Sequence, residues 1–472
     1  MTSRDYFKGK RVAVIGLGYQ NEMVEDLKYL IKAGALVSIY DLKSEARLKS
    51  SLVQLRTQGL ANYVCGQIPA DDLLDMDLIV LSHEYPLDST FLKGVQSRNE
   101  VFKKNEGSRA DRAKIKETSN LILERFVPIE YPETLFFKLA PPVTLVGVIG
   151  ACGKSTVFSM LSPMLERACR SIDDQGYFEL NFEDGSGILC HLKKIKNGDV
   201  VLLKMSPEIQ KELYGMRISP SVAIFVTLPA SGSYETSPFE ILSYQTYNNF
   251  IIAPDEIIDL MRSRQVQVKA KILRTKASIV PLGWKLNGWV ATNDSHDREN
   301  AALALQAARL FKLSDEDAER LLVKWKTLKG RLELVKKTKT LEFYNDGASV
   351  SAESTENAIR TLSVGKNVIL IFGGAGGKSD YRALYSILLT QVKSLVLVPG
   401  SGTLRERVVL NRFREDGLVL YSAPSLEEAV RLAVENSARG DRILFSPGFE
   451  AAGLDSSRAE RAERFLRAVR GL

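Results

Sequence analysis

Residues 143–157, VTLVGVIGACGKSTV, constrain the fold of this chain more than any other stretch. An apolar run leads into a glycine-rich turn that ends in the letters GKST. Because glycines let backbone N–H groups close around an anion at a helix start, the pattern indicates a strand, a phosphate-binding loop and a helix. In this interpretation Lys154 meets nucleotide phosphates and Ser155 faces Mg²⁺. Val148 stands where the full Walker spacing has a glycine, so an ordinary strand-to-helix turn is the alternative.

The length and composition of the chain favour a soluble protein of several domains. Its 472 residues are too many for one hydrophobic core and predict about three domains. The fractions of hydrophobic and charged residues, 45% and 26%, are ordinary for globular proteins. Residues 1–10 are polar and the next apolar run has only the length of a strand, so we expect no secretory leader, no membrane insertion and a cytoplasmic protein.

The cysteine, histidine and charge patterns argue against a zinc site and against a nucleic-acid interface. The four cysteines are widely spaced without a CxxC pair and the chain has three histidines, so a zinc site is not expected. The net charge of +7 favours polyanions, but no basic run with interleaved aromatic residues is present. We therefore expect no nucleic-acid partner; the charge indicates attraction for phosphorylated ligands or simply a solvated surface.

Residues 11–41 have the pattern of a βαβ unit. A strand and the turn Gly16-x-Gly18 precede a helical pattern, and a second strand ends in Asp41. Such a unit places a diphosphate on a helix N-terminus and a ribose near the carboxylate. Because Asn21 replaces the third glycine of the usual fingerprint, three interpretations stay open: a dinucleotide fold, another nucleotide-diphosphate binder, or an unliganded turn.

Strands and helices alternate after residue 139, which predicts mostly parallel, doubly wound sheets with ligands at the carboxyl ends of the strands. Residues 93–125 are charged and poor in large apolar residues, so we expect an insertion or linker there. Expected strands lie at 77–82, at 221–228, at 248–256, on both sides of the turn Asn197-Gly198 within 187–206, and in the stretches LEFYND, NVILIFGG, SLVLVPGS and RILFSPG; expected helices cover 158–168, 298–311 and 315–325.

Seven stretches follow one another in a fixed order along nearly the whole chain: KGKRVAVIGLG, GVIGACGKST, SHDRENAALALQAARL, LKGRLELV, FYNDGASVSAESTENAI, ILIFGGAGGKSDY and LFSPG. This order of motifs resembles the Mur ligase family, and its D-glutamate-adding type in particular. The resemblance implies an α/β fold of three domains: a Rossmann-like N-terminal domain (1–138), a central P-loop-type ATP-binding domain (139–329) and a Rossmann-like C-terminal domain (330–472).

Enzymes of this family use ATP to join an amino acid to a UDP-muramoyl carboxylate through an acyl phosphate, in peptidoglycan precursor synthesis. The resemblance thus implies ATP and Mg²⁺ as cofactors, a UDP-muramoyl substrate and an amino acid as partners, and a monomer. It implies these site residues: Lys154 for catalysis; Gly150, Gly153, Lys154, Ser155, Thr156, Asn300, Arg331 and Asp346 for nucleotide; Gly16, Gly18 and Asp41 for the UDP substrate; Lys378 for the amino acid; Ser155 and Glu240 for metal.

Several of these residues also have simpler interpretations. Asn300 fits a helix surface, Arg331 and Lys378 fit loop charges, and Asp346 fits a turn. Glu240, which aligns approximately with the carbamylated lysine of the family, also fits a solvated loop.

The metal and amino-acid positions depart from the family pattern. Lys204 stands where the family has a metal-binding glutamate, and Ala230 lies where an Asp-His pair is expected. Ala348 replaces a lysine, Cys152 replaces a polar loop residue, and Ala451 and Arg458 correspond roughly to a serine and a phenylalanine.

Two alternatives to an active ligase follow. The first is a catalytically impaired relative that binds nucleotide and acts as a binding or regulatory protein. The second is a nicotinamide site at Gly16, Gly18 and Asp41, which leaves the GKST turn and the third domain unexplained.

Overall fold

The structure is a computed structural model of the 472-residue chain. It describes residues 3–17, 23–60, 62–82, 85, 89–107, 126–150, 153–171, 175–180, 187–228, 237–281, 284–286, 289–290, 296–376, 380–449 and 458–472.

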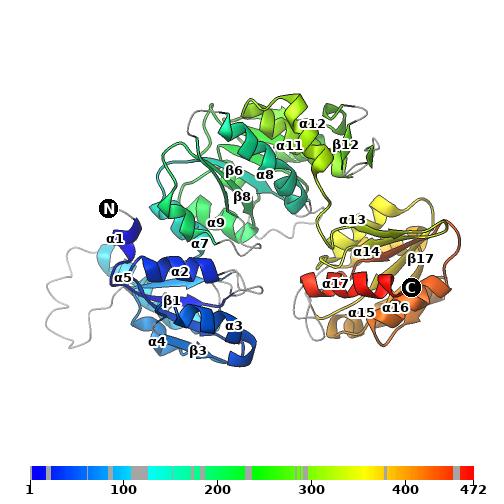
Figure 1. The fold of residues 1–472 in the computed structure, drawn as a ribbon, viewed down its shortest axis with the longest axis horizontal. Helices are drawn as coiled ribbons and strands as arrows, with labels where there is room; N and C mark the ends of the chain where they lie inside the picture. Colours follow the sequence, from blue (N-terminus) through cyan, green and yellow to red (C-terminus); the bar gives the residue numbers. More distant parts are fainter. Residues whose placement is uncertain are drawn as a thin grey trace.

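Within the described residues, three large sheets follow one another along the chain, each flanked by helices, and form the three lobes of Figure 1; a fourth, two-stranded sheet is the hairpin of β12 and β13. The first lobe is blue to cyan, the central one green, and the third yellow to red. This arrangement confirms the predicted α/β class with three sheets in series. The predicted domain boundaries stay a proposal. Within the described residues, no helix is both long and apolar enough to cross a membrane.

The first sheet is parallel, with the strand order β3-β2-β1-β4-β5. Its middle strands are buried on both faces, which explains their continuous apolar runs. Its elements are α1 (Ser3–Phe7), β1 (Arg11–Ile15), α2 (Val24–Lys32), β2 (Leu36–Asp41), α3 (Glu45–Arg56), β3 (Asn62–Cys65), α4 (Ala70–Leu74), β4 (Leu78–Leu81), η1 (Thr90–Leu92), α5 (Lys93–Gly107), β5 (Ile129–Glu130) and α7 (Pro132–Leu139).

The first part of the predicted insertion at 93–125 is a packed helix, α5, and not a linker. Val95 is fully buried, and the Asn99 side chain exchanges two hydrogen bonds with the backbone of Val127. These few contacts tie the charged helix to the lobe. Residues 108–125 lie outside the described residues.

The central sheet is also parallel, with the order β11-β10-β9-β6-β8-β7, so β6 and the turn after it lie in the middle of the sheet. Its elements are β6 (Thr144–Ile149), α8 (Lys154–Arg170), β7 (Tyr177–Leu180), η3 (Leu189–Lys193), β8 (Val200–Met205), α9 (Pro207–Gly215), β9 (Val222–Phe225), η4 (Glu240–Leu242), β10 (Phe250–Ala253), α10 (Asp255–Ser263), β11 (Lys271–Arg274), η5 (Ala277–Ile279), the hairpin β12 (Lys285–Leu286) and β13 (Trp289–Val290), α11 (His296–Leu310) and α12 (Asp315–Lys324).

The prediction of two strands within 187–206 is wrong, because its first half is the 3₁₀ helix η3. Leu189 and Leu192 are buried at a spacing of three residues, which suits a 3₁₀ helix and not a strand. The carboxylate of Asp26 on α2 accepts hydrogen bonds from the N–H groups of Ile188 (2.7 Å) and Leu189 (2.6 Å). This contact with the first lobe caps the start of η3.

The third sheet has the order β14-β15-β19-β16-β17-β18 and is parallel except for β14, which pairs antiparallel with β15. The four predicted strands are confirmed, and the half-exposed edge strands β14 and β18 were missed. The elements are β14 (Glu333–Lys337), β15 (Glu342–Asn345), α13 (Ala352–Leu362), β16 (Val368–Phe372), α14 (Arg382–Gln391), β17 (Val392–Leu397), α15 (Ser401–Glu415), β18 (Val419–Ser422), α16 (Leu426–Glu435), β19 (Arg442–Phe445) and α17 (Arg458–Arg470).

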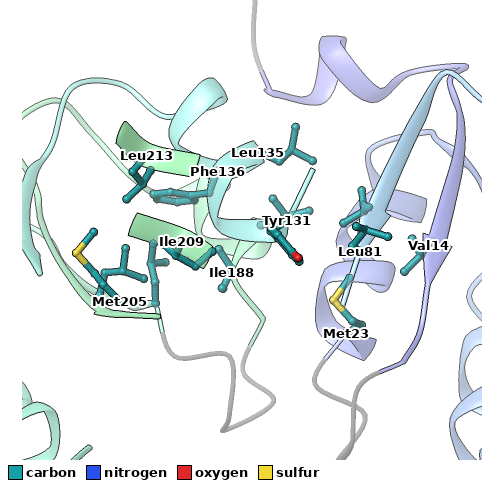
Figure 2. Close-up of a cluster of buried hydrophobic side chains, with 14 of the residues drawn as sticks. Val14, Met23, Leu81, Tyr131, Leu135, Phe136, Ile188, Met205, Ile209 and Leu213 are labelled. Atoms are coloured by element: carbon teal, nitrogen blue, oxygen red, sulfur yellow. The ribbon is translucent and has the colours of Figure 1, made fainter. Parts of the chain in front are cut away.

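One hydrophobic cluster joins the first and central lobes (Figure 2). Tyr131, just before α7, and Leu135 and Phe136 of α7 lie between side chains of the first sheet, such as Val14, and side chains of the central lobe, such as Leu213. The third sheet has its own two clusters. The first two lobes therefore share a core, whereas the third packs around itself.

We predict that Phe136→Ala weakens both of the first two sheets. Phe136 is fully buried, and a Phe→Ala change in a core costs about 3–5 kcal/mol. Hydrogen–deuterium exchange should accelerate in β1, β4 and β8 and stay unchanged in β16. The matched variant is Phe465→Ala, whose fully buried ring stacks on Phe445 and should affect only the third sheet. Acceleration confined to the central sheet in Phe136→Ala would contradict a shared core.

Candidate functional site

A cavity of about 390 Å³, here called the main cavity, lies between the start of α8 and the third lobe. The central lobe contributes the helix start, one residue of β8 and one of α11, and the third lobe contributes mainly α13 and the loop before it. The lining residues are Gly153, Lys154, Ser155, Thr156, Lys204, Asp297, Thr327, Arg331, Leu332, Asp346, Ala348, Val350, Ser351, Ser354, Asn357, Ala358, Thr361 and Arg458.

The turn between β6 and α8 requires its glycines. Gly150 has φ +149°, and a Cβ on it would lie 2.6 Å from the carbonyl oxygen of Thr227. Gly153 has φ +82° and immediately precedes α8. The helix has no acidic residue in its first turn, so its positive end faces the main cavity without a compensating charge of that turn. This is the geometry of an anion site.

Lys154, the first residue of α8, lines the cavity and donates a hydrogen bond to the carbonyl oxygen of Gly150. Opposite it lies α13, whose start is capped by Ser351: its hydroxyl accepts from the N–H of Ser354 at 3.2 Å. Burial and Glu356 raise the pKa of Glu353 in the first turn of α13, and the charge of Lys154 opposes this shift. The two helix starts are therefore electrostatically coupled across the cavity.

Asp346 fixes the connection between the central and third lobes. Its carboxylate accepts from the Ser446 hydroxyl at 2.7 Å and from the N–H of Leu332 at 3.1 Å. Leu332 has φ +49°, a conformation that costs a non-glycine residue about 1 kcal/mol or more. Burial raises the pKa of Asp346 to about 7, although the bonds from Ser446 and Leu332 and the charge of Arg331 favour the ionised form. The alternative interpretation of Asp346 as a simple turn former therefore describes only part of its role.

Asn300 lies on α11, one turn after the cavity-lining Asp297. It is 1% exposed, and neither polar atom of its side chain has a hydrogen-bond partner within the described part of the chain. An unsatisfied buried amide costs about 1–3 kcal/mol, so its position calls for an explanation. Contact with a bound ligand would supply one. The alternative of a helix-surface residue does not fit this burial.

The structure brings Gly16 and Asp41 together in the first lobe. The buried Asp41 carboxylate accepts from the N–H of Leu17 at 2.9 Å and from the N–H of Lys43 at 2.8 Å. Tyr85, which the sequence analysis missed, donates its hydroxyl to Asp41 at 3.2 Å, and a Cβ on Gly16 would lie 2.5 Å from its ring. The tyrosine therefore covers the glycine turn. Gly18 lies outside the described residues.

The two predicted metal residues lie at different cavities. Glu240 lines a small cavity beside α9, whereas Ser155 lines the main cavity together with Lys204. Across the ranges that the structure describes, no three His, Cys, Asp or Glu side chains form a group that could hold a metal ion. Ala230 lies outside those ranges.

Arg461 is a further positioning residue that the sequence analysis missed. Its buried guanidinium donates to the carbonyl oxygens of Gly347 (2.8 Å), Phe449 (2.7 Å) and Ser349 (2.8 Å). These bonds hold the loop that brings Ala348 to the main cavity. The sequence feature that could have indicated Arg461 is its position one helical turn after Arg458. Lys378, Cys152 and Ala451 lie outside the described residues.

Comparisons with known proteins gave a family model that matches the C-terminal part of the chain, and relatives and solved structures that align with nearly all of it. Residues 330–449 match the family model described as Mur ligase, glutamate ligase domain. The UDP-N-acetylmuramoylalanine–D-glutamate ligase of Clostridioides difficile (strain 630) is 24% identical over 499 residues, covering 98% of this chain and 99% of the relative. The murein peptide ligase mpl from Psychrobacter arcticus 273-4 has a TM-score of 0.55 at 14% identity, over 98% and 99% of the two chains. The MurF ligase from Thermotoga maritima in complex with ADP has a TM-score of 0.50 at 15% identity, over 99% and 96%.

We predict that Asp346→Asn flattens the dependence of stability on pH. The native pKa of about 7 exceeds the unfolded value near 4, so the native state binds more protons between these values and wild-type stability falls as pH rises from about 4 to 7. Asp26, whose pKa burial also raises to about 7, contributes the same trend to both proteins. Urea unfolding at several pH values measures the two slopes. Equal slopes would show that Asp346 titrates normally.

Proposed function

Because this chain is similar over its whole length to UDP-N-acetylmuramoylalanine–D-glutamate ligases, a type of Mur ligase, we propose that it is an ATP-dependent amide ligase. Its substrates would be UDP-N-acetylmuramoyl-L-alanine and D-glutamate, in peptidoglycan precursor synthesis. The observation that carries this proposal is the main cavity, in which the start of α8 faces Arg331, Asp346 and α13. A triphosphate held there would lie between two lobes that can close on it.

The residues around the main cavity fit a nucleotide. The positive end of α8 and Lys154 suit the phosphates, since both place positive charge at one edge of the central sheet. Asn300 is not itself a lining residue, but it lies one helical turn after the lining residue Asp297; its buried amide has no partner among the described residues, and a nucleotide contact would satisfy it. Arg331 lines the cavity from the connection between the lobes. Gly150, Gly153, Ser155 and Thr156 complete the proposed nucleotide set.

In the proposed reaction an oxygen of the muramoyl carboxylate forms a bond to the γ-phosphorus, and the bond from that phosphorus to ADP breaks. The amine of D-glutamate then attacks the acyl carbon, phosphate leaves, and the nitrogen loses a proton. Lys154 would neutralise the charge on the transferred phosphoryl group. Closure of the third lobe would keep water from the acyl phosphate. The first lobe, with Gly16, Gly18 and Asp41, would hold the UDP group, and Lys378 a carboxylate of the amino acid.

Mg²⁺ would supply charge neutralisation at the phosphates. Ser155 lines the main cavity and fits one ion bound mostly to the nucleotide and water. The described residues do not fit a second ion, because Glu240 lies at another cavity and Lys204 lines the main one. We also propose the domain boundaries 138/139 and 329/330, a monomer and a cytoplasmic location.

The test is turnover with ATP, Mg²⁺, UDP-N-acetylmuramoyl-L-alanine and D-glutamate, with phosphate release and product mass followed together. We predict product formation that falls at least about 100-fold in Lys154→Ala, since a phosphate-stabilising cation is lost. The control is Lys269→Ala, an exposed lysine of the same lobe away from the cavity. ATP binding without substrate-dependent ADP would instead identify a catalytically impaired, nucleotide-binding relative.

A further inference from the structure

Lys204 is a cationic residue of the main cavity to which the proposed reaction gives no role. Strand β8 lies directly beside β6, with Lys204 opposite Val148 and Met205 opposite Ile149. The lysine is thus level with the last residues before the phosphate-binding turn, at the carboxyl edge of the sheet. Its side chain is half-buried and lines the main cavity together with Lys154 and Ser155.

The face of β8 that carries Lys204 is also the face that α8 covers. Side chains alternate along a strand, so Lys204 shares its face with Leu202. Leu202 belongs to the hydrophobic cluster that contains the buried residues of α8, whereas Met205 belongs to the cluster shared with the first lobe. Figure 2 shows Met205 within that shared cluster. Lys204 is therefore directed to the side of the sheet where α8 begins, and not into the core between the lobes.

Charge around the main cavity is predominantly positive. Its basic lining residues within the described chain are Lys154, Lys204, Arg331 and Arg458, and its acidic ones are Asp297 and Asp346. The carboxylate of Asp346 is buried and already accepts two hydrogen bonds. This excess of positive charge suits a polyanion. Protonated Lys204 cannot itself act as a ligand of a divalent cation, because an ammonium group has no lone pair to offer.

We infer that Lys204 supplies, directly from its ammonium group, the positive charge at the terminal phosphate that a second Mg²⁺ would otherwise provide. This inference rests on the proposed function for the identity of the triphosphate. The reaction itself is unchanged: the oxygen–phosphorus bond forms and the bond to ADP breaks. Lys204 donates hydrogen bonds to the phosphoryl oxygens throughout, and no proton needs to leave it.

The test is the affinity of a non-hydrolysable ATP analogue, measured by titration calorimetry in Mg²⁺ and again in EDTA. In wild type we expect the EDTA affinity to lie within about tenfold of the Mg²⁺ affinity, because the lysine remains when the ion is removed. Lys204→Gln should increase the ratio of the Mg²⁺ affinity to the EDTA affinity by about 10- to 100-fold, as expected for loss of a hydrogen bond between charged groups. Lys204→Glu should widen it further, and Lys204→Arg should restore most of the wild-type ratio.

The matched control is Lys269→Gln, which removes an exposed lysine of the same lobe and should leave the ratio unchanged. Thermal unfolding of each variant shows whether the fold is intact. An equal ratio in wild type and Lys204→Gln would overturn the inference. The measurement needs no turnover, so it separates failure of this inference from failure of the proposed ligase activity, which substrate-dependent ADP release tests.

Discussion

The positive end of α8 at the carboxyl edge of the central sheet is the constraint on which the rest of the site depends. Backbone N–H groups point out of the helix there, and no acidic side chain of its first turn offsets them. Lys154 and Lys204 add charge from two adjacent elements. This concentration of positive charge at one edge of the sheet attracts a polyanion, and it is the reason that we propose a triphosphate for the main cavity.

The three lobes differ in how firmly they are held, and this difference suits the proposed reaction, which must exclude water. The first and central lobes share a hydrophobic cluster and the buried contact of Asp26 with the start of η3 (Figure 2). The third lobe has separate clusters and meets the central lobe across the main cavity. Leu332, in a left-handed conformation, and the bond from its N–H to Asp346 lie at the connection. A small change in the backbone conformation at this connection would move α13 relative to Lys154.

Sequence alone predicted the parts of the fold that local patterns determine. Apolar runs followed by glycine predicted the central strands and the turn before Lys154. A buried strand is recognised from its own run of apolar residues, and the turn from the backbone conformations that its glycines allow. Prediction from sequence failed where the structure depends on contacts between residues that are distant in the sequence. The helix η3 is capped by Asp26, 162 residues away from Ile188, and Tyr85 covers Gly16 from another strand end. Glu240 resembled a metal residue by alignment, but the chain places it at another cavity.

A crystal structure with a non-hydrolysable ATP analogue and Mg²⁺ tests the central claim most directly. The account predicts the terminal phosphate in the main cavity, within hydrogen-bonding distance of the amino groups of both Lys154 and Lys204, with Asn300 hydrogen-bonded to the nucleotide. It also predicts α13 closer to the start of α8. A nucleotide bound instead at Gly16 and Asp41, with the main cavity filled by water, would contradict the account and would favour a dinucleotide-binding function for the first lobe.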